Sequence, residues 1–115
     1  MPTVLILDDD LGFCVWLGRA LNEAGICTVP ACRCDEALEI GADPGYKVDL
    51  VILNPEIEGC SQLLEQLKGT KVLAIDRAGD LRVDGTIRRP RGKSLPAPDR
   101  YVKAVRELLS LGPVC

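Results

Sequence analysis

Two short runs of the chain, residues 4–7 and 50–53, are apolar at every position. Runs of this length without alternation are typical of strands that are buried on both faces of a parallel sheet. We therefore predict strands over 4–7 and 49–53. Weaker patterns predict further strands over 26–31, 71–75 and 85–88.

Between these strands, apolar residues recur at helical spacing. The spacing predicts helices over 11–24, 35–40, 61–67 and 100–111. Asp10 is suited to cap the first helix, and Gly25, Gly41 and Gly69 are suited to end the first three. Phe13 and Trp16 lie on the apolar stripe of the first helix, so we expect both in the core.

The order of these elements predicts an α/β fold, a doubly wound five-stranded parallel sheet with right-handed crossovers. A chain of 115 residues is the right size for one core, so we expect a single domain over 1–115. The stretch 77–99 holds three glycines and three prolines and has no helical stripe. We therefore expect the fourth helix of a regular β-α alternation, the one that would connect the fourth and fifth strands, to be shortened or missing.

Composition narrows the functional classes. The net charge of -3 is mild and gives no reason to expect nucleic acid as a partner. No apolar run approaches the ~20 residues of a membrane helix, and no secretory leader opens the chain, so we expect a cytoplasmic protein. The chain has no histidine, which excludes phosphohistidine transfer and histidine-dependent triads.

Six cysteines lie mostly inside apolar segments: Cys14, Cys27, Cys32, Cys34, Cys60 and Cys115. In an α/β sequence without a leader we expect them to be reduced, buried thiols. The Cys32-Arg33-Cys34 spacing does not fit a zinc site, and no histidine is present to complete one.

Polar side chains follow the two strongest strands. Asp8, Asp9 and Asp10 come directly after the first strand, and Asn54 follows the third. Ligands of open α/β sheets bind outside the carboxyl ends of the strands. Carboxylates at this edge are typical of a site for a hard divalent cation.

With these features in this order, the chain resembles a response-regulator receiver (CheY-like) domain of two-component, or phosphorelay, signal transduction. The resemblance rests on four segments: Leu7-Asp8-Asp9-Asp10, Asp35-Glu36-Ala37-Leu38, Asp49-Leu50-Val51-Ile52-Leu53 and Gly85…Arg89-Pro90. It covers nearly the whole chain and implies a flavodoxin-like, receiver-like fold. In that family an acidic pair holds Mg²⁺, an aspartate after strand three accepts the phosphoryl group, a Ser or Thr ends strand four, and a Lys-Pro ends strand five.

The resemblance implies roles for five pocket positions, several of which carry a different residue here. Asp8 and Asp9 match the acidic pair, Asn54 the phospho-acceptor, Asp76 the hydroxyl residue and Arg89 the lysine. The amide of Asn54 is neutral and not nucleophilic, so we expect no phosphorylation there. Asp76 places a negative charge where a phosphoryl oxygen would lie. Arg89 keeps the positive charge but spreads it over a planar fork that suits carboxylates.

Two interpretations of the acidic cluster follow. Asp8 and Asp9, with the side-chain oxygen of Asn54, could form a residual site that binds Mg²⁺ weakly. We favour the second, in which no cofactor binds and Arg89 bridges Asp76 and one of Asp8 or Asp9. The basic residues Arg88, Arg89, Arg91 and Lys93, with Arg82 nearby, lack interleaved aromatic residues, so we expect a solvated loop.

We therefore expect a degenerate receiver, a pseudo-receiver without enzymatic activity that serves as a protein-interaction module. The implied partners are signalling proteins, either a histidine kinase or an output protein, with no nucleic acid and no membrane. The alternative is an active receiver that is phosphorylated at Asp8 or Asp9 and dephosphorylates itself with Mg²⁺. A nucleotide-binding domain of similar fold is disfavoured because no glycine-rich phosphate loop follows the first strand.

Overall fold

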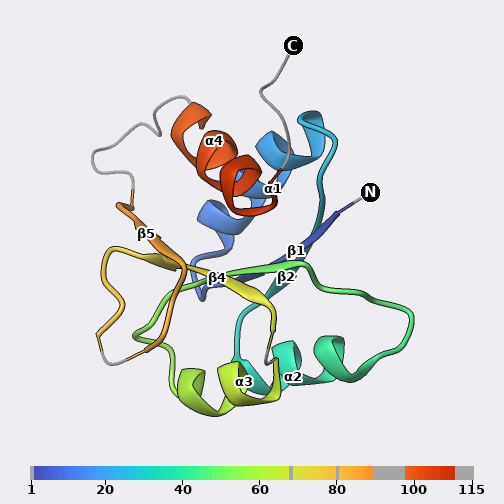
Figure 1. Cartoon of the computed structure of the whole chain (residues 1–115), viewed down its shortest axis with the longest axis vertical. Coiled ribbons are helices and arrows are strands. Elements are labelled where there is room, and N and C mark those ends of the chain that lie inside the picture. The colour runs from blue at the N-terminus through green and yellow to red at the C-terminus, as the bar shows by residue number, and fades with distance from the viewer. Residues whose placement is uncertain (1, 68, 80, 90–97, 111–115) are drawn as a thin grey trace.

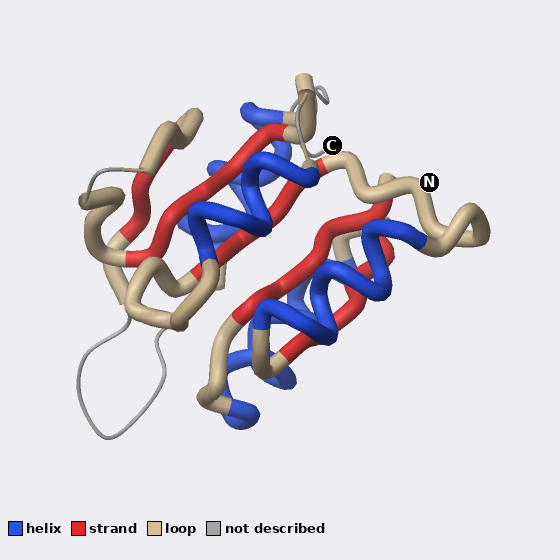
Figure 2. Tube along the Cα trace, turned by 90° about the horizontal axis from the view of Figure 1, so that it is seen from below, coloured by secondary structure: helices blue, strands red, loops and turns tan. Residues whose placement is uncertain are grey.

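A computed structural model describes residues 2–67, 69–79, 81–89 and 98–110. Five parallel strands form one sheet in the order β2-β1-β3-β4-β5, which confirms the predicted fold class. The strands are β1 (Thr3–Leu7), β2 (Cys27–Ala31), β3 (Leu50–Leu53), β4 (Lys71–Ile75) and β5 (Gly85–Ile87). The helices are α1 (Leu11–Glu23), α2 (Cys34–Ala42), α3 (Cys60–Gln66) and α4 (Asp99–Leu108). Figure 2 shows helices both in front of and behind the strands.

Helices α1 and α4 cover one face of the sheet, and α2 and α3 cover the other (Figure 1). Side chains alternate across a strand, so the apolar runs supply both faces. The upper core, on the α1–α4 side, contains Val4, Ile6, Phe13, Cys14, Leu17, Leu21, Ile26, Leu50, Ile52, Leu73, Ile75, Tyr101 and Val105. The lower core, on the α2–α3 side, contains Leu5, Leu7, Ala31, Cys34, Ala37, Val51, Leu53, Cys60, Leu63 and Val72. This burial on both faces explains why β3 contains no polar residue and why β1 contains none after Thr3.

The element boundaries agree closely with the sequence patterns at the start of the chain and less well at its end. Asp10 caps α1 by accepting a hydrogen bond from the Phe13 N–H at 3.1 Å, and Gly25 follows the helix with φ of 84°. Helix α2 continues through Ala42 instead of ending before Gly41. The prediction that the last helix reaches residue 111 is wrong, because α4 ends at Leu108 and Ser110 has φ of 57°, in the left-handed region.

The connection between β4 and β5 replaces a helix with an irregular segment. Within the described part of it, residues 76–79 and 81–84, there is no helix, as the sequence predicted. Leu81 and Val83 are half-buried against the lower core and cover part of the surface that a helix would cover. Asp84 fixes the segment to β4, since its N–H donates to the Val72 carbonyl at 2.8 Å and its carboxylate accepts from the Val72 N–H at 2.7 Å.

The cysteines are only partly as expected. The five in the described residues are free thiols, and Cys14, Cys34 and Cys60 are buried. Cys27 is exposed and Cys32 is half-buried, because β2 is an edge strand and Cys32 follows it; Cys115 lies outside the described residues. No helix among the described residues is long and apolar enough to cross a membrane.

Candidate functional site

Four strand ends bring the predicted site residues to one edge of the sheet. Asp8 follows β1, Asn54 follows β3, and Asp76 follows β4. Arg89 comes two residues after the end of β5. The ladder continues past these ends, with the Asn54 N–H donating to the Leu7 carbonyl at 2.9 Å and the Asp76 N–H to the Ile87 carbonyl at 2.7 Å. Parallel strands end at the same edge, so residues more than 80 positions apart, such as Asp8 and Arg89, can meet.

The centre of the site is an ion pair between Asp8 and Arg89. The Asp8 side chain is fully buried, and its Oδ2 lies 2.5 Å from Nη2 of Arg89. Its Oδ1 accepts the backbone N–H of Asp10 at 2.9 Å. Both carboxylate oxygens therefore have partners within the protein. A charge-assisted hydrogen bond of this kind offsets much of the cost of removing a charged carboxylate from water.

Arg89 is held from several sides. Its guanidinium carbon lies 4.8 Å from the centre of the Phe13 ring, a cation–π arrangement, and Nη1 is 3.9 Å from Oδ2 of Asp10. Burial alone would lower the pKa of Arg89, but the hydrogen bond and charge of Asp8, with the charges of Asp76 and Asp10, raise it above its ordinary value. Arg89 is thus a permanent cation in this pocket.

The side chain of Asp76 contacts a different group of Arg89 from the one predicted. Its Oδ1 accepts the backbone N–H of Arg89 at 2.8 Å, whereas the guanidinium pairs with Asp8 and Asp10. The expectation that the guanidinium bridges Asp76 is therefore wrong. The second carboxylate is that of Asp10, which the sequence placed in the acidic cluster and at the helix cap but not in a pair with Arg89. The backbone also explains the difference: Asp76 has φ of 70°, and the Arg77 N–H donates to the Ile75 carbonyl at 3.0 Å, which makes a tight γ-turn.

Asn54 uses its side chain within its own turn. The half-buried residue accepts the Glu56 N–H on Oδ1 at 3.0 Å, and its carbonyl accepts the Ile57 N–H at 3.1 Å. Cys60 adds a weaker contact, with Sγ 3.5 Å from the Asn54 carbonyl. The side-chain oxygen that a residual metal site would require is already a hydrogen-bond acceptor.

These residues do not fit a Mg²⁺ ion. Magnesium requires several oxygen ligands in near-octahedral geometry and loses its water reluctantly. Asp8 and Asn54 offer oxygens that accept hydrogen bonds from the protein, while Asp9 is exposed. The charge of Arg89 lies where a cation would be repelled. The described residues contain no group of three or more possible metal ligands.

An aromatic group connects the pocket to helices α1 and α4, which sequence reasoning did not foresee. Phe13, Trp16 and Tyr101 pack in pairs with ring centres 5.5–5.9 Å apart. Phe13 and Tyr101 are buried, but Trp16 is only half-buried, less than expected. The Tyr101 hydroxyl donates to the Arg88 carbonyl at 2.5 Å. Helical spacing indicated that Phe13 and Trp16 face inward, but nothing in the sequence indicated that Arg89 would cover Phe13.

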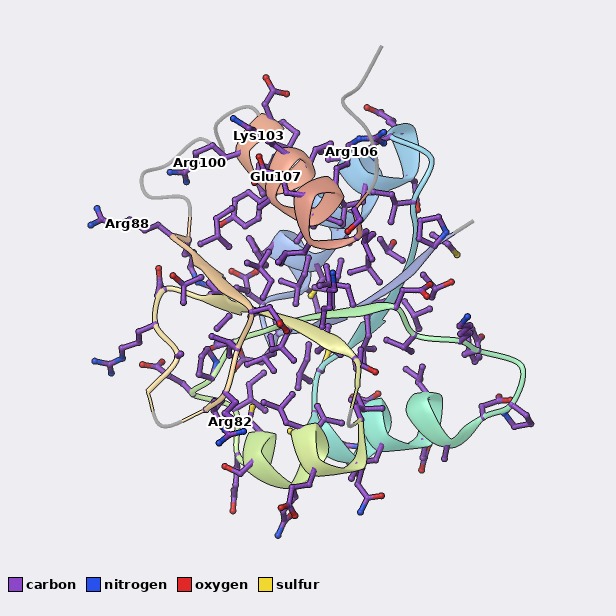
Figure 3. The ribbon with its side chains drawn as sticks, in the orientation of Figure 1. Arg82, Arg88, Arg100, Lys103, Arg106 and Glu107 are labelled. Carbon is purple, nitrogen blue, oxygen red and sulfur yellow. The ribbon has the colours of Figure 1, made fainter. Side chains whose placement is uncertain are left out.

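The basic residues do not form one patch. Arg88 and Arg100 lie near the end of β5 and the start of α4, whereas Arg82, although near them in sequence, lies at the opposite end of β5 beside α3 (Figure 3). Arg82, Arg88, Arg100 and Lys103 are exposed and point outward, as a solvated surface would (Figure 3). Arg91 and Lys93 lie outside the described residues.

Comparison with solved structures places the fold among receiver domains. A response regulator receiver protein from Burkholderia phymatum is 22% identical, with a TM-score of 0.80 and complete coverage of both chains. A two-component response regulator from Clostridium difficile is 19% identical, with a TM-score of 0.75 over 96% of this chain and 97% of that chain. The response regulator TrrA from Thermotoga maritima, in complex with Mg²⁺-BeF, is 24% identical, with a TM-score of 0.74 over 94% and 99%.

A scan against protein-family models gives no match, and a search of curated protein sequences gives none either. The likeness thus lies in the structure: the chain has the receiver fold across its length, with sequence identity too low to carry function by itself.

Proposed function

We propose that this chain is a receiver domain of two-component signalling that acts as a protein-interaction module without forming an aspartyl phosphate. The observation that carries the proposal is the ion pair between Asp8 and Arg89, with both oxygens of Asp8 engaged. On the resemblance, Asp8 is a ligand of the metal on which phosphorylation depends. Here the guanidinium of Arg89 forms an ion pair with that carboxylate in place of a metal ion.

Two further residues support the proposal chemically. Asn54 lacks the ionised carboxylate that attacks phosphorus, and its side-chain oxygen accepts a hydrogen bond from Glu56. Asp76 is exposed at the same edge and would repel an incoming phosphoryl group. Position 54 thus lacks the carboxylate nucleophile, and position 76 lacks the hydroxyl.

The surface of α1 supports a protein partner. Leu11 and Val15, one helical turn apart, are 62% and 60% exposed, and they border a shallow groove of about 590 Å³ that Trp16 also lines. Exposed apolar side chains that lie together are typical of protein-binding surfaces. A histidine kinase or an output protein is the class of partner that a receiver would take. A cytoplasmic location and the absence of nucleic-acid binding remain predictions.

Phosphorylation of the purified chain tests the proposal. Incubation with Mg²⁺ and acetyl phosphate, followed by intact mass measurement, should show no phosphoryl adduct on the wild type. Asn54→Asp alone should gain little, because Asp76 and Arg89 still oppose the chemistry. The triple variant Asn54→Asp, Asp76→Ser, Arg89→Lys should gain clearly more.

The same experiment separates the alternative receiver mechanism. An adduct that forms on the wild type in a Mg²⁺-dependent manner would contradict the proposal, and peptide mapping would locate it at Asp8, Asp9 or elsewhere. The geometry disfavours Asp8 as an acceptor because its side chain is fully buried.

A further inference from the structure

Three basic residues form a strip along one edge of the molecule. Arg88 follows β5, and Arg100 and Lys103 lie one helical turn apart near the start of α4. Figure 3 shows their side chains along the same edge, all pointing away from the core. Nη2 of Arg100 lies 3.4 Å from the Arg88 carbonyl, so the end of β5 and the start of α4 are neighbours here. We call Arg88, Arg100 and Lys103 the basic strip.

The charges of the basic strip are not paired within the described part of the protein. All three side chains are exposed, and none of the ion pairs among the described residues involves them. Glu107 lies one helical turn after Lys103 on α4, but the two form no ion pair in these described residues either. Arg100 contributes one long hydrogen bond, to the Arg88 carbonyl. The positive charges of the strip are therefore accessible to a partner.

The fold fixes where these charges lie relative to one another. The Arg88 carbonyl accepts a hydrogen bond from the Tyr101 hydroxyl at 2.5 Å, and Tyr101 is buried in the upper core. This bond joins the backbone at the end of β5 to α4, which carries the other two members of the strip. The chain as a whole has a net charge of -3, so the strip is a local positive surface on an acidic protein. Such a surface attracts and orients a partner of opposite charge.

We propose that the basic strip binds an acidic segment of a partner protein, a helix whose carboxylates are spaced one helical turn apart. Arg100 and Lys103 have this same spacing on α4, so two carboxylates on one face of a partner helix match them. Arg88 and Arg100 each present a planar guanidinium that suits a carboxylate. The proposal rests on the proposed function, because it takes the chain to be a protein-interaction module, and it adds the chemistry of the partner.

A nucleic acid or an anionic membrane fits the basic strip less well. Both present a continuous array of phosphates, which a protein binds by neutralising many charges at once. Asp99 and Glu107 are exposed on the same helix as the strip and would repel such an array, as would the net charge of the chain. A protein segment with a few carboxylates places each one opposite a basic side chain and leaves the rest of its surface uncharged. The strip therefore favours a protein partner.

A titration of the isotope-labelled chain, followed by NMR, tests the strip. The probe is an alanine-rich helical peptide with glutamates one turn apart, and the same peptide with glutamines is the control. The acidic peptide should bind at low salt and more weakly as salt rises, because salt screens exposed charges. Arg100→Glu and Lys103→Glu should each weaken binding roughly fivefold. Arg82→Glu makes the same change at an exposed arginine outside the strip and should leave binding unchanged.

The wild-type spectra locate the peptide even if a variant fails to fold, and shifts confined to Arg88 and the first turns of α4 would support the proposal. It is overturned if no saturable binding occurs at low salt, if the shifts centre elsewhere, or if Arg82→Glu weakens binding as much as Arg100→Glu does. Tighter binding of a thymidylate oligonucleotide or of anionic lipid vesicles would overturn it in favour of a polyanion. These results do not depend on the phosphorylation experiment, so either proposal can fail alone.

Discussion

Replacing Arg89 by alanine removes the cation that neutralises the buried carboxylate of Asp8. The remaining hydrogen-bond partner of the Asp8 carboxylate would be the backbone N–H of Asp10, at 2.9 Å from Oδ1. Breaking a buried ion pair from one side costs about 3–5 kcal/mol, because the other charge is left uncompensated. We expect a value of about 3 kcal/mol, at the lower end of that range. The reason is that the Arg89 side chain is 28% exposed, so water can reach Asp8 once it is gone.

For a domain of this size, about 3 kcal/mol corresponds to a fall in melting temperature of roughly 12 °C. Thermal and urea unfolding followed by circular dichroism measure both quantities. Arg77→Ala is the matched control, because Arg77 forms an ion pair with Glu56 at 3.6 Å in which the side chains are 80% and 75% exposed. Such a surface pair contributes only about 0–1 kcal/mol. The loss of stability in Arg89→Lys should fall between those of the two alanine variants, since lysine keeps the charge and loses the planar guanidinium.

A double substitution separates the charge from the packing. Asp8→Asn removes the buried charge and keeps an oxygen for the Asp10 N–H, so adding it to Arg89→Met should cost less than the two single changes together. The reasoning is refuted if Arg89→Ala and Arg77→Ala destabilise the protein equally, or if the two single changes at Asp8 and Arg89 are additive.

Four other outcomes follow from the same geometry. Titration with Mg²⁺, followed by Trp16 fluorescence, should give a dissociation constant of about millimolar or weaker, and a micromolar value would contradict the ion-pair pocket. Arg89→Ala should bind Mg²⁺ more tightly than the wild type. Tyr101→Phe should lower the free energy of unfolding by about 1 kcal/mol through loss of the hydrogen bond to Arg88, as urea unfolding would measure. Burial raises the pKa of Tyr101 from 10.0 to about 12, so its contribution to stability is full below pH 10 and is lost as pH rises through 12. Unfolding between these pH values should therefore be less pH-dependent in Tyr101→Phe, and an unchanged slope would contradict the assignment.

Sequence patterns were sufficient for the fold because the strands are buried on both faces. Such strands contain continuous apolar runs, and glycines mark several of the turns between elements, so the order of elements could be predicted directly. The end of α4 could not, because Ser110 adopts a left-handed backbone conformation that its residue type does not signal.

The candidate site was predictable in its members but not in its contacts. Strand ends indicated that Asp8, Asn54, Asp76 and Arg89 share one edge, and the exchange of lysine for arginine indicated a carboxylate partner. Which carboxylates the guanidinium contacts depends on the γ-turn at Asp76, which exposes that side chain and directs it to a backbone N–H. A turn of this kind depends on the surrounding fold and cannot be read from the residue type alone.

The short, irregular connection between β4 and β5 has a consequence for local unfolding. Strand β5 has three residues, lies at the edge of the sheet, and has no fully buried position, whereas β1 lies between two strands and both cores. Amide hydrogens of β5 should therefore exchange with solvent through local opening, and those of β1 only when the whole domain unfolds. Arg89 follows β5 and Asp8 follows β1, so their ion pair joins the least protected strand to one of the most protected. Each opening of β5 that moves Arg89 must first break that pair. The Asp8–Arg89 ion pair therefore stabilises the edge strand of the sheet against local unfolding.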